Sequence, residues 1–249
     1  MTAKAFLLKD KVALVTGDSK LWTKPVATAL ASVHANVAIA SKNSPKLKEA
    51  VEAVHQETGG KGMAIPTDVT DATQVQEAVN QVVAEYGRID ILVNAGDIHF
   101  FQPFLEIKSD EWDKVMDYNF NSALNFCRAT GKQMLERKYG RVINIVSGLA
   151  ERGMANGSAY CVAMGGVLQL TRALAMEWAL QGVTVNAIVT GWFTEPDKPI
   201  DERLARYIPV RRYGEPEEIG SMVVYLASDA TEFTTGQLMY VDGGLMAHA

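Results

Sequence analysis

The sequence predicts a single soluble α/β domain spanning residues 1–249, built on one doubly wound parallel sheet of the Rossmann type. Short apolar runs rich in β-branched residues alternate along the chain with longer amphipathic segments. The short runs are apolar throughout, as expected for strands whose two faces are both covered by helices. This regular alternation of strand and helix predicts parallel strands joined by right-handed crossovers, and one such sheet can organise 249 residues.

Seven strands and six helices are expected in order along the chain. The predicted strands are Val12–Thr16, Val37–Ala40, Gly62–Pro66, Ile89–Val93, Arg141–Val146, Val183–Val189 and Gln237–Val241. The predicted helices are Lys24–Ser32, Ser44–Glu57, Ala72–Tyr86, Ser109–Lys138, Ala155–Ala179 and Pro216–Ala227. Residues typical of helix starts occur at 70–73 and 109–112. No repeat, low-complexity tract or linker interrupts the pattern, so no domain boundary is expected.

The composition argues against several functional classes. The formal net charge is −5 and the chain has no basic run of five or more residues, so a nucleic-acid binder is not expected. Cys127 and Cys161 fall within predicted helices, which favours a reduced, cytoplasmic protein. No apolar stretch approaches a membrane span, and no secretory signal is evident. The histidines and cysteines lack metal-ligand spacing, so no metal site is expected.

The residues that directly follow the predicted strands are the best candidates for a functional site. In open parallel sheets, ligands bind beyond the carboxyl ends of the strands, near the point where the strand order reverses. The segments at that edge are residues 17–23, 41–42, 68–69, 94–96, 147 and 190–194.

These segments, taken in order, resemble the short-chain dehydrogenase/reductase family from Lys11 to Gly244. The motifs that carry the resemblance are Thr16-Gly17, Asp68-Val-Thr-Asp71, Asp90-Ile-Leu-Val-Asn-Ala-Gly96, Asn119, Ser147, Tyr160, Val185-Asn-Ala-Ile188, Arg212-Tyr-Gly-Glu-Pro-Glu-Glu-Ile219 and Val241-Asp-Gly-Gly244. Each motif is weak alone, and their joint order and spacing are specific. The resemblance implies that the Ser147 and Tyr160 hydroxyls bind the oxygen of a small carbonyl or alcohol substrate. It also implies that Asn119 supports a proton relay, unless it is only a residue of a helix kink.

The same resemblance implies a dinucleotide site. The residues implied to bind the cofactor are Gly17, Ser19, Lys20, Ser41, Lys42, Asp68, Val69, Asn94, Ala95, Gly96 and Thr194. Two ammonium groups and a hydroxyl suit a 2′-phosphate, whereas an NAD site places a carboxylate after the second strand. NADP(H) is therefore expected rather than NAD(H), with surface solvation as the alternative reading of both lysines and the absence of any dinucleotide left open.

Two departures from the family pattern concern the chemistry. Met164 stands where the family has a lysine one turn after the tyrosine, so Tyr160 is expected to titrate near the ordinary phenol pKa of about 10. In the glycine-rich turn only Gly17 remains, and Leu21 and Thr23 replace the other two glycines. Trp22 adds an indole beside a backbone that would approach a pyrophosphate. Weakened dinucleotide binding, a different loop path and a slight shift that admits the cofactor all remain open.

Other polar residues could take over the role of the missing lysine. Asp97 and His99 follow the fourth strand, Glu151 and Arg152 follow Ser147, and Glu195 lies in the expected substrate loop. His99 could act as an acid or base near neutral pH, or simply be a surface histidine. An aromatic group could line an apolar substrate pocket or belong to the core or an interface: Phe100, Phe101, Trp192 and Phe193.

Three functions remain open on this basis. The first is an NADP(H)-linked oxidoreductase of reduced efficiency, biased towards carbonyl reduction because a neutral tyrosine still donates a proton. The second is a non-redox enzyme that uses the Ser147–Tyr160 pair without a dinucleotide. The third is an inactive subunit in a mixed assembly with an active homologue. The resemblance otherwise implies a homo-dimer or homo-tetramer.

Overall fold

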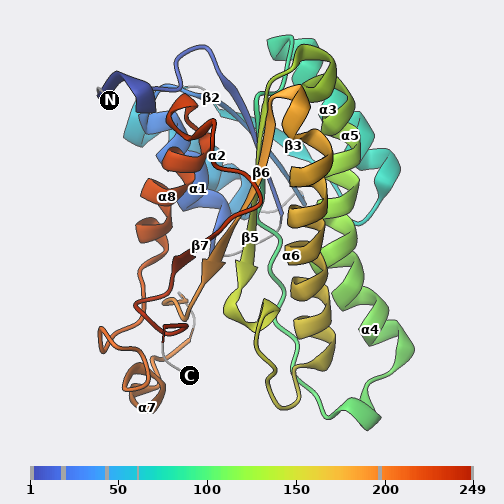
Figure 1. Cartoon of the computed structure of the whole chain (residues 1–249), viewed down its shortest axis with the longest axis vertical. Coiled ribbons are helices and arrows are strands. Elements are labelled where there is room, and N and C mark those ends of the chain that lie inside the picture. Colours follow the sequence, from blue (N-terminus) through green and yellow to red (C-terminus); the bar gives the residue numbers. More distant parts are fainter. Residues whose placement is uncertain (1–2, 18–20, 43–44, 61, 196–197, 248–249) are drawn as a thin grey trace.

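A seven-stranded parallel sheet organises the chain in the computed structural model (Figure 1). The structure describes residues 3–17, 21–42, 45–60, 62–195 and 198–247. The strand order is β3-β2-β1-β4-β5-β6-β7, so the order reverses between β1 and β4. The strands are β1 Val12–Thr16, β2 Asn36–Ser41, β3 Gly62–Pro66, β4 Ile91–Asn94, β5 Gly140–Ser147, β6 Val183–Thr190 and β7 Leu238–Val241. The predicted doubly wound fold is thus confirmed, with strand bounds displaced by up to two residues.

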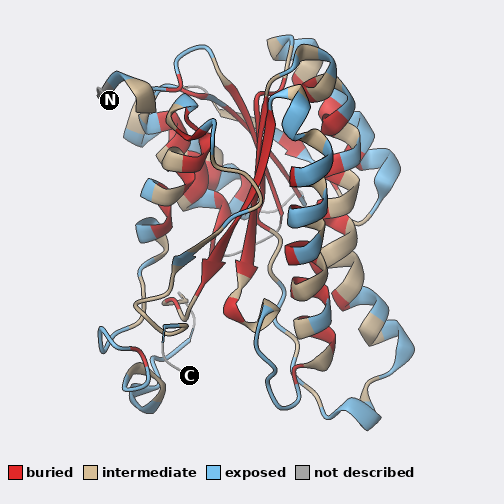
Figure 2. Ribbon diagram, in the orientation of Figure 1, coloured by how far each residue is buried: buried red, intermediate tan, exposed pale blue. Residues whose placement is uncertain are grey.

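Helices cover both faces of the sheet. One layer holds α1 Thr23–Ser32, α2 Pro45–Thr58 and α8 Gly220–Ala227, and the other holds α3 Ala72–Tyr86, α4 Ser109–Met116, α5 Ser122–Arg137 and α6 Ser158–Trp178 (Figure 1). Strand side chains alternate between the two layers: Ala13 and Val15 pack with the α1 layer, and Val12 and Leu14 pack with the α3 layer. The central strands are therefore buried on both faces (Figure 2).

Two predicted helices are interrupted. The segment predicted as one helix, Ser109–Lys138, is divided by a π-helical stretch, Asp117–Asn121, between α4 and α5. The apolar periodicity continues through this stretch, so the sequence pattern alone does not reveal the break. The segment predicted as Pro216–Ala227 begins with a 3₁₀ turn, Pro216–Ile219, before α8. A short helix, α7 Glu202–Ala205, was not predicted.

Helix α6 lies within the predicted segment Ala155–Ala179 but is more apolar than the sequence analysis allowed. Within Ser158–Gln181, which comprises α6 and the turn after it, an 18-residue stretch has a mean hydropathy of 1.2. By length and composition alone this helix could cross a membrane, contrary to the expectation that no stretch comes close. One face of α6 packs on the sheet and on α5, with Ala163, Val167 and Thr171 fully or almost fully buried. A core helix that covers a parallel sheet can be as apolar as a membrane-spanning helix, which explains why α6 has the length and hydropathy of one.

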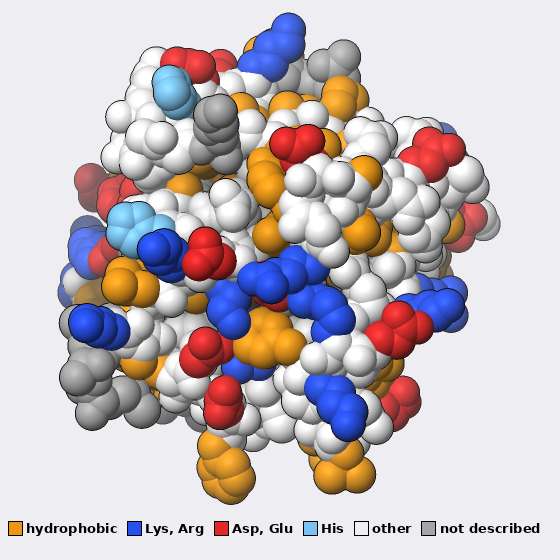
Figure 3. Space-filling model, turned by 90° about the horizontal axis from the view of Figure 1, so that it is seen from above, with side chains coloured by type: hydrophobic (Ala, Val, Ile, Leu, Met, Phe, Trp, Pro, Cys, Tyr) orange, Lys and Arg blue, Asp and Glu red, His pale blue; other side chains and the backbone are white. Residues whose placement is uncertain are grey.

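A charged network covers the amino-terminal edge of the sheet (Figure 3). Buried Asp90 accepts hydrogen bonds from Arg88 at 2.9 Å and Arg137 at 2.8 Å. Lys11 and Arg141 lie over the ring of Tyr139. These contacts seal the end of the sheet opposite the strand ends where ligands are expected, leaving the carboxyl edge, the lower end in Figure 1, for function.

Candidate active site

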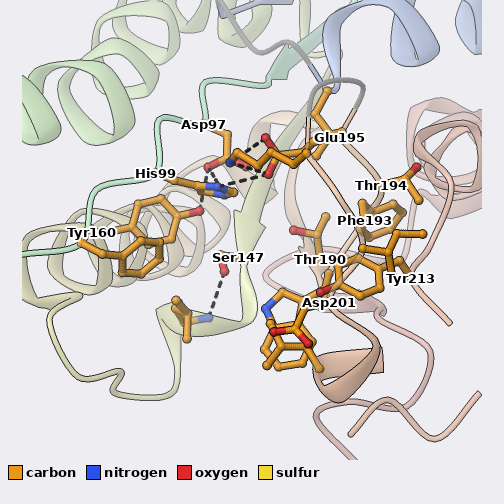
Figure 4. Close-up of a pocket in the computed structure, with 18 of the residues that line it drawn as sticks. Asp97, His99, Ser147, Tyr160, Thr190, Phe193, Thr194, Glu195, Asp201 and Tyr213 are labelled. Atoms are coloured by element: carbon orange, nitrogen blue, oxygen red, sulfur yellow. Dashed lines mark hydrogen bonds and ion pairs between the residues drawn. The ribbon is translucent and has the colours of Figure 1, made fainter. Parts of the chain in front are cut away.

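A cavity of about 310 Å³ opens at the carboxyl edge of the sheet (Figure 4). Its walls come from the segments after β1, β4, β5 and β6 and from the first turn of α6. The lining residues used below are Leu21, Trp22, Asp97, His99, Phe101, Ser147, Leu149, Tyr160, Trp192, Phe193, Thr194, Glu195 and Lys198. The volume lies at the low end of small-molecule sites, which span roughly 300–1,000 Å³.

Ser147 and Tyr160 face this cavity together, as the sequence motifs suggest (Figure 4). Ser147 ends β5, and its Oγ accepts a hydrogen bond from the backbone N–H of Leu149 at 3.2 Å. Because that bond uses a lone pair of the oxygen, the Ser147 hydroxyl proton can be donated to a substrate oxygen. Tyr160 lies in the first turn of α6 and is only 1% exposed, so packing fixes the direction of its ring.

The Tyr160 hydroxyl donates a short hydrogen bond to the Asp97 carboxylate. The distance from the hydroxyl to Oδ1 is 2.6 Å. Burial of the phenol, then the negative charge and the hydrogen bond of Asp97, raise the pKa of Tyr160 well above its ordinary value. A hydrogen bond from Ser147 offsets part of this shift. The sequence-based expectation of an ordinary phenol is therefore wrong: Tyr160 is held protonated.

Asp97 accepts from three donors that come from three parts of the chain. Besides Tyr160, the Trp22 Nε1–H donates to Oδ2 at 3.1 Å, and His99 Nε2 lies 3.4 Å from Oδ1. Burial alone raises the pKa of the Asp97 carboxyl. The hydrogen bond and charge of His99, with the bonds from Tyr160 and Trp22, outweigh that effect and hold the pKa below its ordinary value. Asp97 is thus a carboxylate in a largely buried place.

His99 links this carboxylate to the surface. Its side chain is 39% exposed, and its Nδ1 lies 3.8 Å from Glu195 Oε1. The hydrogen bond to Asp97 raises the pKa of His99 above its ordinary value; burial opposes the shift, and the charges of Asp97 and Glu195 add to it. Glu195 in turn accepts from Lys198 at 2.8 Å. A chain of charged groups therefore runs from Tyr160 to the rim of the cavity (Figure 4).

Asn119 lies outside this chain of groups but fixes its position. It is buried in the π-helical stretch, and its side chain both accepts from the Ile98 N–H at 2.8 Å and donates to the Ile98 carbonyl at 3.0 Å. Ile98 stands between Asp97 and His99, so Asn119 holds the backbone that carries both. A side chain that satisfies both backbone polar groups of one residue restrains the two peptide units on either side of that residue.

Met164 lies one turn after Tyr160 and is fully packed. It is 1% exposed in an apolar cluster with Ala123, Val146 and Val167. A thioether there supplies neither charge nor a strong hydrogen bond, so Met164 acts as a packing residue.

In the described part of the turn between β1 and α1, Gly17 is followed by the side chains of residues 21–23 instead of further glycines. Gly17 has φ +114°, and a Cβ on it would lie 2.6 Å from the backbone nitrogen of Gly96, so only glycine fits there. Trp22 is 1% exposed and meets Phe193 edge-on with ring centroids 4.8 Å apart. The Thr23 hydroxyl donates to the Gly17 carbonyl at 3.1 Å. Ser19 and Lys20, expected to bind the cofactor, lie outside the described residues.

The other residues expected to bind the cofactor are spread along the same edge. Lys42 is exposed, and its ammonium lies 4.5 Å from the ring centroid of Tyr118, near Asp68. Buried Asn94 is engaged inside the sheet, where it accepts from Thr16 at 3.2 Å and donates to Asn144 at 2.8 Å. The remaining positions are Ser41, Val69 and Ala95, which are buried, and Gly96 and Thr194, which are partly buried. Of the expected set, Thr194 lines the cavity; Gly17, Ser41, Lys42, Asp68, Val69 and 94–96 do not.

Comparisons with known proteins show to which family the chain belongs. The family model described as Enoyl-(Acyl carrier protein) reductase matches residues 23–246. A 3-oxoacyl-(acyl-carrier-protein) reductase of Synechocystis sp. is 35% identical over 242 residues, covering 96% of this chain and 98% of that protein. The chain belongs to the short-chain dehydrogenase/reductase family. The resemblance drawn from the motifs is confirmed.

Further short-chain dehydrogenases/reductases agree in sequence and in structure. The D-threitol dehydrogenase of Mycolicibacterium smegmatis is 37% identical over 250 residues, with 96% of this chain and 94% of that protein covered. The crystal structure of a putative gluconate dehydrogenase from Agrobacterium tumefaciens superposes with a TM-score of 0.91 at 33% identity, covering 98% of this chain and 99% of that one. The chain is accordingly an enzyme of the oxidoreductase type, and its relatives use NAD(P)(H).

Sequence reasoning missed the role of Trp22 at the site. The indole was expected only as an obstacle beside a phosphate loop, yet it is a hydrogen-bond donor to Asp97 across 75 positions of sequence. A buried carboxylate needs such donors, so Asp97, an acidic residue in the loop after the fourth strand, was a usable signal. Its partners were not readable from the sequence.

Proposed function

We propose that this short-chain dehydrogenase/reductase reduces a compact, largely apolar carbonyl compound with NADP(H), and that its affinity for the dinucleotide is weakened. The observation that carries the proposal is the pair of hydroxyl donors, Ser147 and Tyr160, facing one cavity with Tyr160 held protonated. Carbonyl reduction needs a proton donor at the oxygen, whereas alcohol oxidation needs a base. A phenol beside a carboxylate favours the first direction.

The chain's own side chains account for binding and proton transfer to the substrate. The Ser147 hydroxyl would orient the carbonyl oxygen, and the Tyr160 hydroxyl would turn from Asp97 to that oxygen and donate its proton as negative charge develops there. The dinucleotide, when bound, supplies a hydride to the carbonyl carbon. The walls formed by Phe101, Leu149 and Trp192 would exclude water and favour apolar substituents on the carbonyl.

The adenosine half of the dinucleotide fits the residues near the switch point. Gly17 keeps the turn after β1 close to β4, and Lys42 presents an exposed ammonium at the end of β2. The sequence after β2, Ser41-Lys-Asn-Ser44, has no carboxylate, which supports NADP(H) over NAD(H). Pro25 is the third residue of α1 and lacks an N–H, so this helix start offers a phosphate fewer backbone donors than usual.

The hydride-bearing half would have to reach the Ser147–Tyr160 cavity past Trp22. Leu21 and Trp22 wall the cavity on the β1 side, and Trp22 is held by Asp97 and Phe193. Breaking the hydrogen bond to a carboxylate costs about 1.5–3 kcal/mol, which corresponds to roughly 10- to 150-fold in dissociation constant. This is the physical basis of the weakened affinity.

The same wall supports a second candidate, a non-redox reaction at the same hydroxyl pair. If Trp22 stays in place, the cavity takes a substrate alone, and Ser147 and Tyr160 would polarise a carbonyl for elimination or isomerisation. The carboxylate of Asp97 would then be the available base.

One comparison of variants separates the two candidates. NADPH binding is followed by nicotinamide fluorescence, and turnover by NADPH absorbance with a panel of apolar ketones and aldehydes. For the reductase, Trp22→Ile tightens NADPH binding, and Tyr160→Phe abolishes reduction while binding persists. Consumption of a carbonyl substrate without NADPH in the wild type, lost in Tyr160→Phe, would instead establish the non-redox reaction. A wild type that neither binds NADPH nor converts any substrate would overturn both.

We also propose that the chain assembles as a homo-oligomer. Val162 and Met176 on α6, and Leu180 just after it, are large apolar side chains that are 50–95% exposed. A face of this kind is typical of a subunit interface. Sedimentation velocity tests this proposal: a monomer at micromolar concentration would contradict it.

A further inference from the structure

The proton donor of the proposed reaction has a carboxylate as its polar neighbour instead of a cation. Met164 places a thioether one turn after Tyr160, and the Tyr160 hydroxyl donates a hydrogen bond to Asp97. After a phenol has given up its proton it must regain one before the next turnover. In the described part of the chain, the path from Tyr160 towards solvent passes through Asp97 and His99.

The geometry at Asp97 suits the passage of a proton. Tyr160 and His99 both contact the same oxygen, Oδ1, at 2.6 Å and 3.4 Å. The other oxygen, Oδ2, is held by Trp22 at 3.1 Å, which fixes the plane of the carboxylate. A carboxylate oxygen has two lone-pair sites, so it can accept from both neighbours without turning.

The outer end of this path is open to solvent. The His99 side chain is 39% exposed, and its second ring nitrogen points to Glu195. The titratable and charged groups facing His99 are Asp97 from the loop after β4, Tyr160 from α6, and Glu195 and Lys198 from the loop after β6. The negative charges of Asp97 and Glu195 outnumber the single positive charge of Lys198, so they favour the protonated form of His99. The protonated imidazole is the form that can donate a proton to Asp97.

We propose that His99 and Asp97 return a proton to Tyr160 after each turnover. They would act in place of the ammonium group that Met164 lacks. This inference rests on the proposed reduction. The step balances as a proton transfer. Tyr160 gives its hydroxyl proton to the substrate oxygen and becomes a phenolate. The Nε2–H of His99 passes its proton to Asp97 Oδ1, and Oδ1 passes a proton to the phenolate. Neutral His99 then takes up a proton from the bulk solvent, so that one solvent proton is consumed in each turnover.

Asn119 keeps this path intact through the backbone. Its two hydrogen bonds to Ile98 fix the backbone on both sides of this residue, which stands between Asp97 and His99. The path is therefore built from the loop after β4 and locked by the π-helical stretch.

The inference is tested first without any dinucleotide. In protein with ¹³Cζ-labelled tyrosine, the Tyr160 signal is assigned by its loss in Tyr160→Phe and followed against pH. The wild-type signal is expected to shift once as His99 titrates and again as the phenol ionises. His99→Gln removes the first step, and the matched control His55→Gln, an exposed histidine on α2, keeps it. Asp97→Asn lowers the phenol pKa by about 1 to 3 pH units, because it removes a neighbouring negative charge.

The second readout is the pH profile of reduction. In the wild type kcat falls as the pH rises through the His99 pKa, because neutral His99 has no proton to pass inward. His99→Gln lowers kcat at neutral pH by about tenfold or more and removes this fall, while His55→Gln preserves the wild-type profile.

Two different failures are distinguishable. A Tyr160 signal with no step at the His99 titration, or an identical phenol pKa in Asp97→Asn, overturns the proton path whatever the turnover. Absence of reduction with every carbonyl overturns the proposed function whatever the Tyr160 signal does. If Asp97→Asn does not fold, the His99→Gln comparison decides alone, because His99 lies at the rim of the cavity.

Discussion

Replacing Trp22 by phenylalanine is expected to weaken the fold in a way that depends on pH. Trp22→Phe keeps an aromatic ring against Phe193 but removes the Nε1–H that donates to Asp97 at 3.1 Å. A hydrogen bond to a charged group contributes about 1.5–3 kcal/mol, so the free energy of unfolding at pH 7 should fall by about that amount. Loss of part of the buried indole adds a packing loss that does not depend on pH.

The sign of the pH dependence follows from the Asp97 carboxyl. Its pKa in the folded protein is lowered below the ordinary value, so its contribution to stability is present above the unfolded pKa of about 3.9 and is lost as the pH falls through the folded value. The hydrogen-bond part of the Trp22→Phe effect is therefore full at pH 7 and shrinks once the pH falls below the unfolded pKa of about 3.9. The packing part stays constant.

Urea unfolding followed by circular dichroism at several pH values measures both parts. The matched control is Trp178→Phe at the end of α6, where the indole packs against Gly131 and lies far from this carboxylate in the fold. The Trp178→Phe variant should show the same decrease in the free energy of unfolding at every pH. A Trp22→Phe loss that is equally large at pH 7 and at the lowest pH at which the wild type still folds would refute the reasoning, because the indole would then stabilise by packing alone.

Three further predictions concern other parts of the site. Met164→Lys should lower the free energy of unfolding by on the order of 3 kcal/mol, because it places an ammonium in an apolar cluster; an unchanged urea midpoint would contradict this. Lys42→Ala should raise the dissociation constant for NADPH about tenfold and leave that for NADH nearly unchanged, as measured by nicotinamide fluorescence; equal effects on both would remove Lys42 from 2′-phosphate recognition. Asn119→Ala should cost about 1–3 kcal/mol of stability and speed amide exchange at Ile98 and His99, and unchanged exchange there would show that Asn119 does not hold this loop.

The fold could be predicted from the sequence because apolar residues are spaced differently in strands and in helices. Strands buried on both faces are uniformly apolar, and the helices between them keep a 3.6-residue pattern, so the sheet of seven strands could be predicted. The π-helical break within Ser109–Lys138 could not be predicted, because one extra residue in a turn leaves the apolar pattern almost unchanged.

The site was predictable only in part, because local patterns place residues along the chain but do not encode contacts between distant side chains. Ser147 and Tyr160 have a motif spacing, and strand order brings the residues after β5 and β6 to one edge. The bonds from Trp22 and Tyr160 to Asp97 join positions 75 and 63 residues apart, and they depend on side-chain directions that no local pattern encodes. The same holds for Asn94, whose amide bonds inside the sheet could not be told from a ligand contact.

Transfer of deuterium from labelled NADPH tests the central claim, that the Ser147–Tyr160 cavity reduces a carbonyl group, most directly. NADPH that carries deuterium at both C4 positions of the nicotinamide is incubated with the wild type and with Tyr160→Phe in the presence of apolar ketones, and the products are analysed by mass spectrometry. An alcohol carrying one deuterium at the former carbonyl carbon, formed by the wild type and not by Tyr160→Phe, is the expected result. Conversion of a ketone by the wild type into a product without deuterium would contradict the claim.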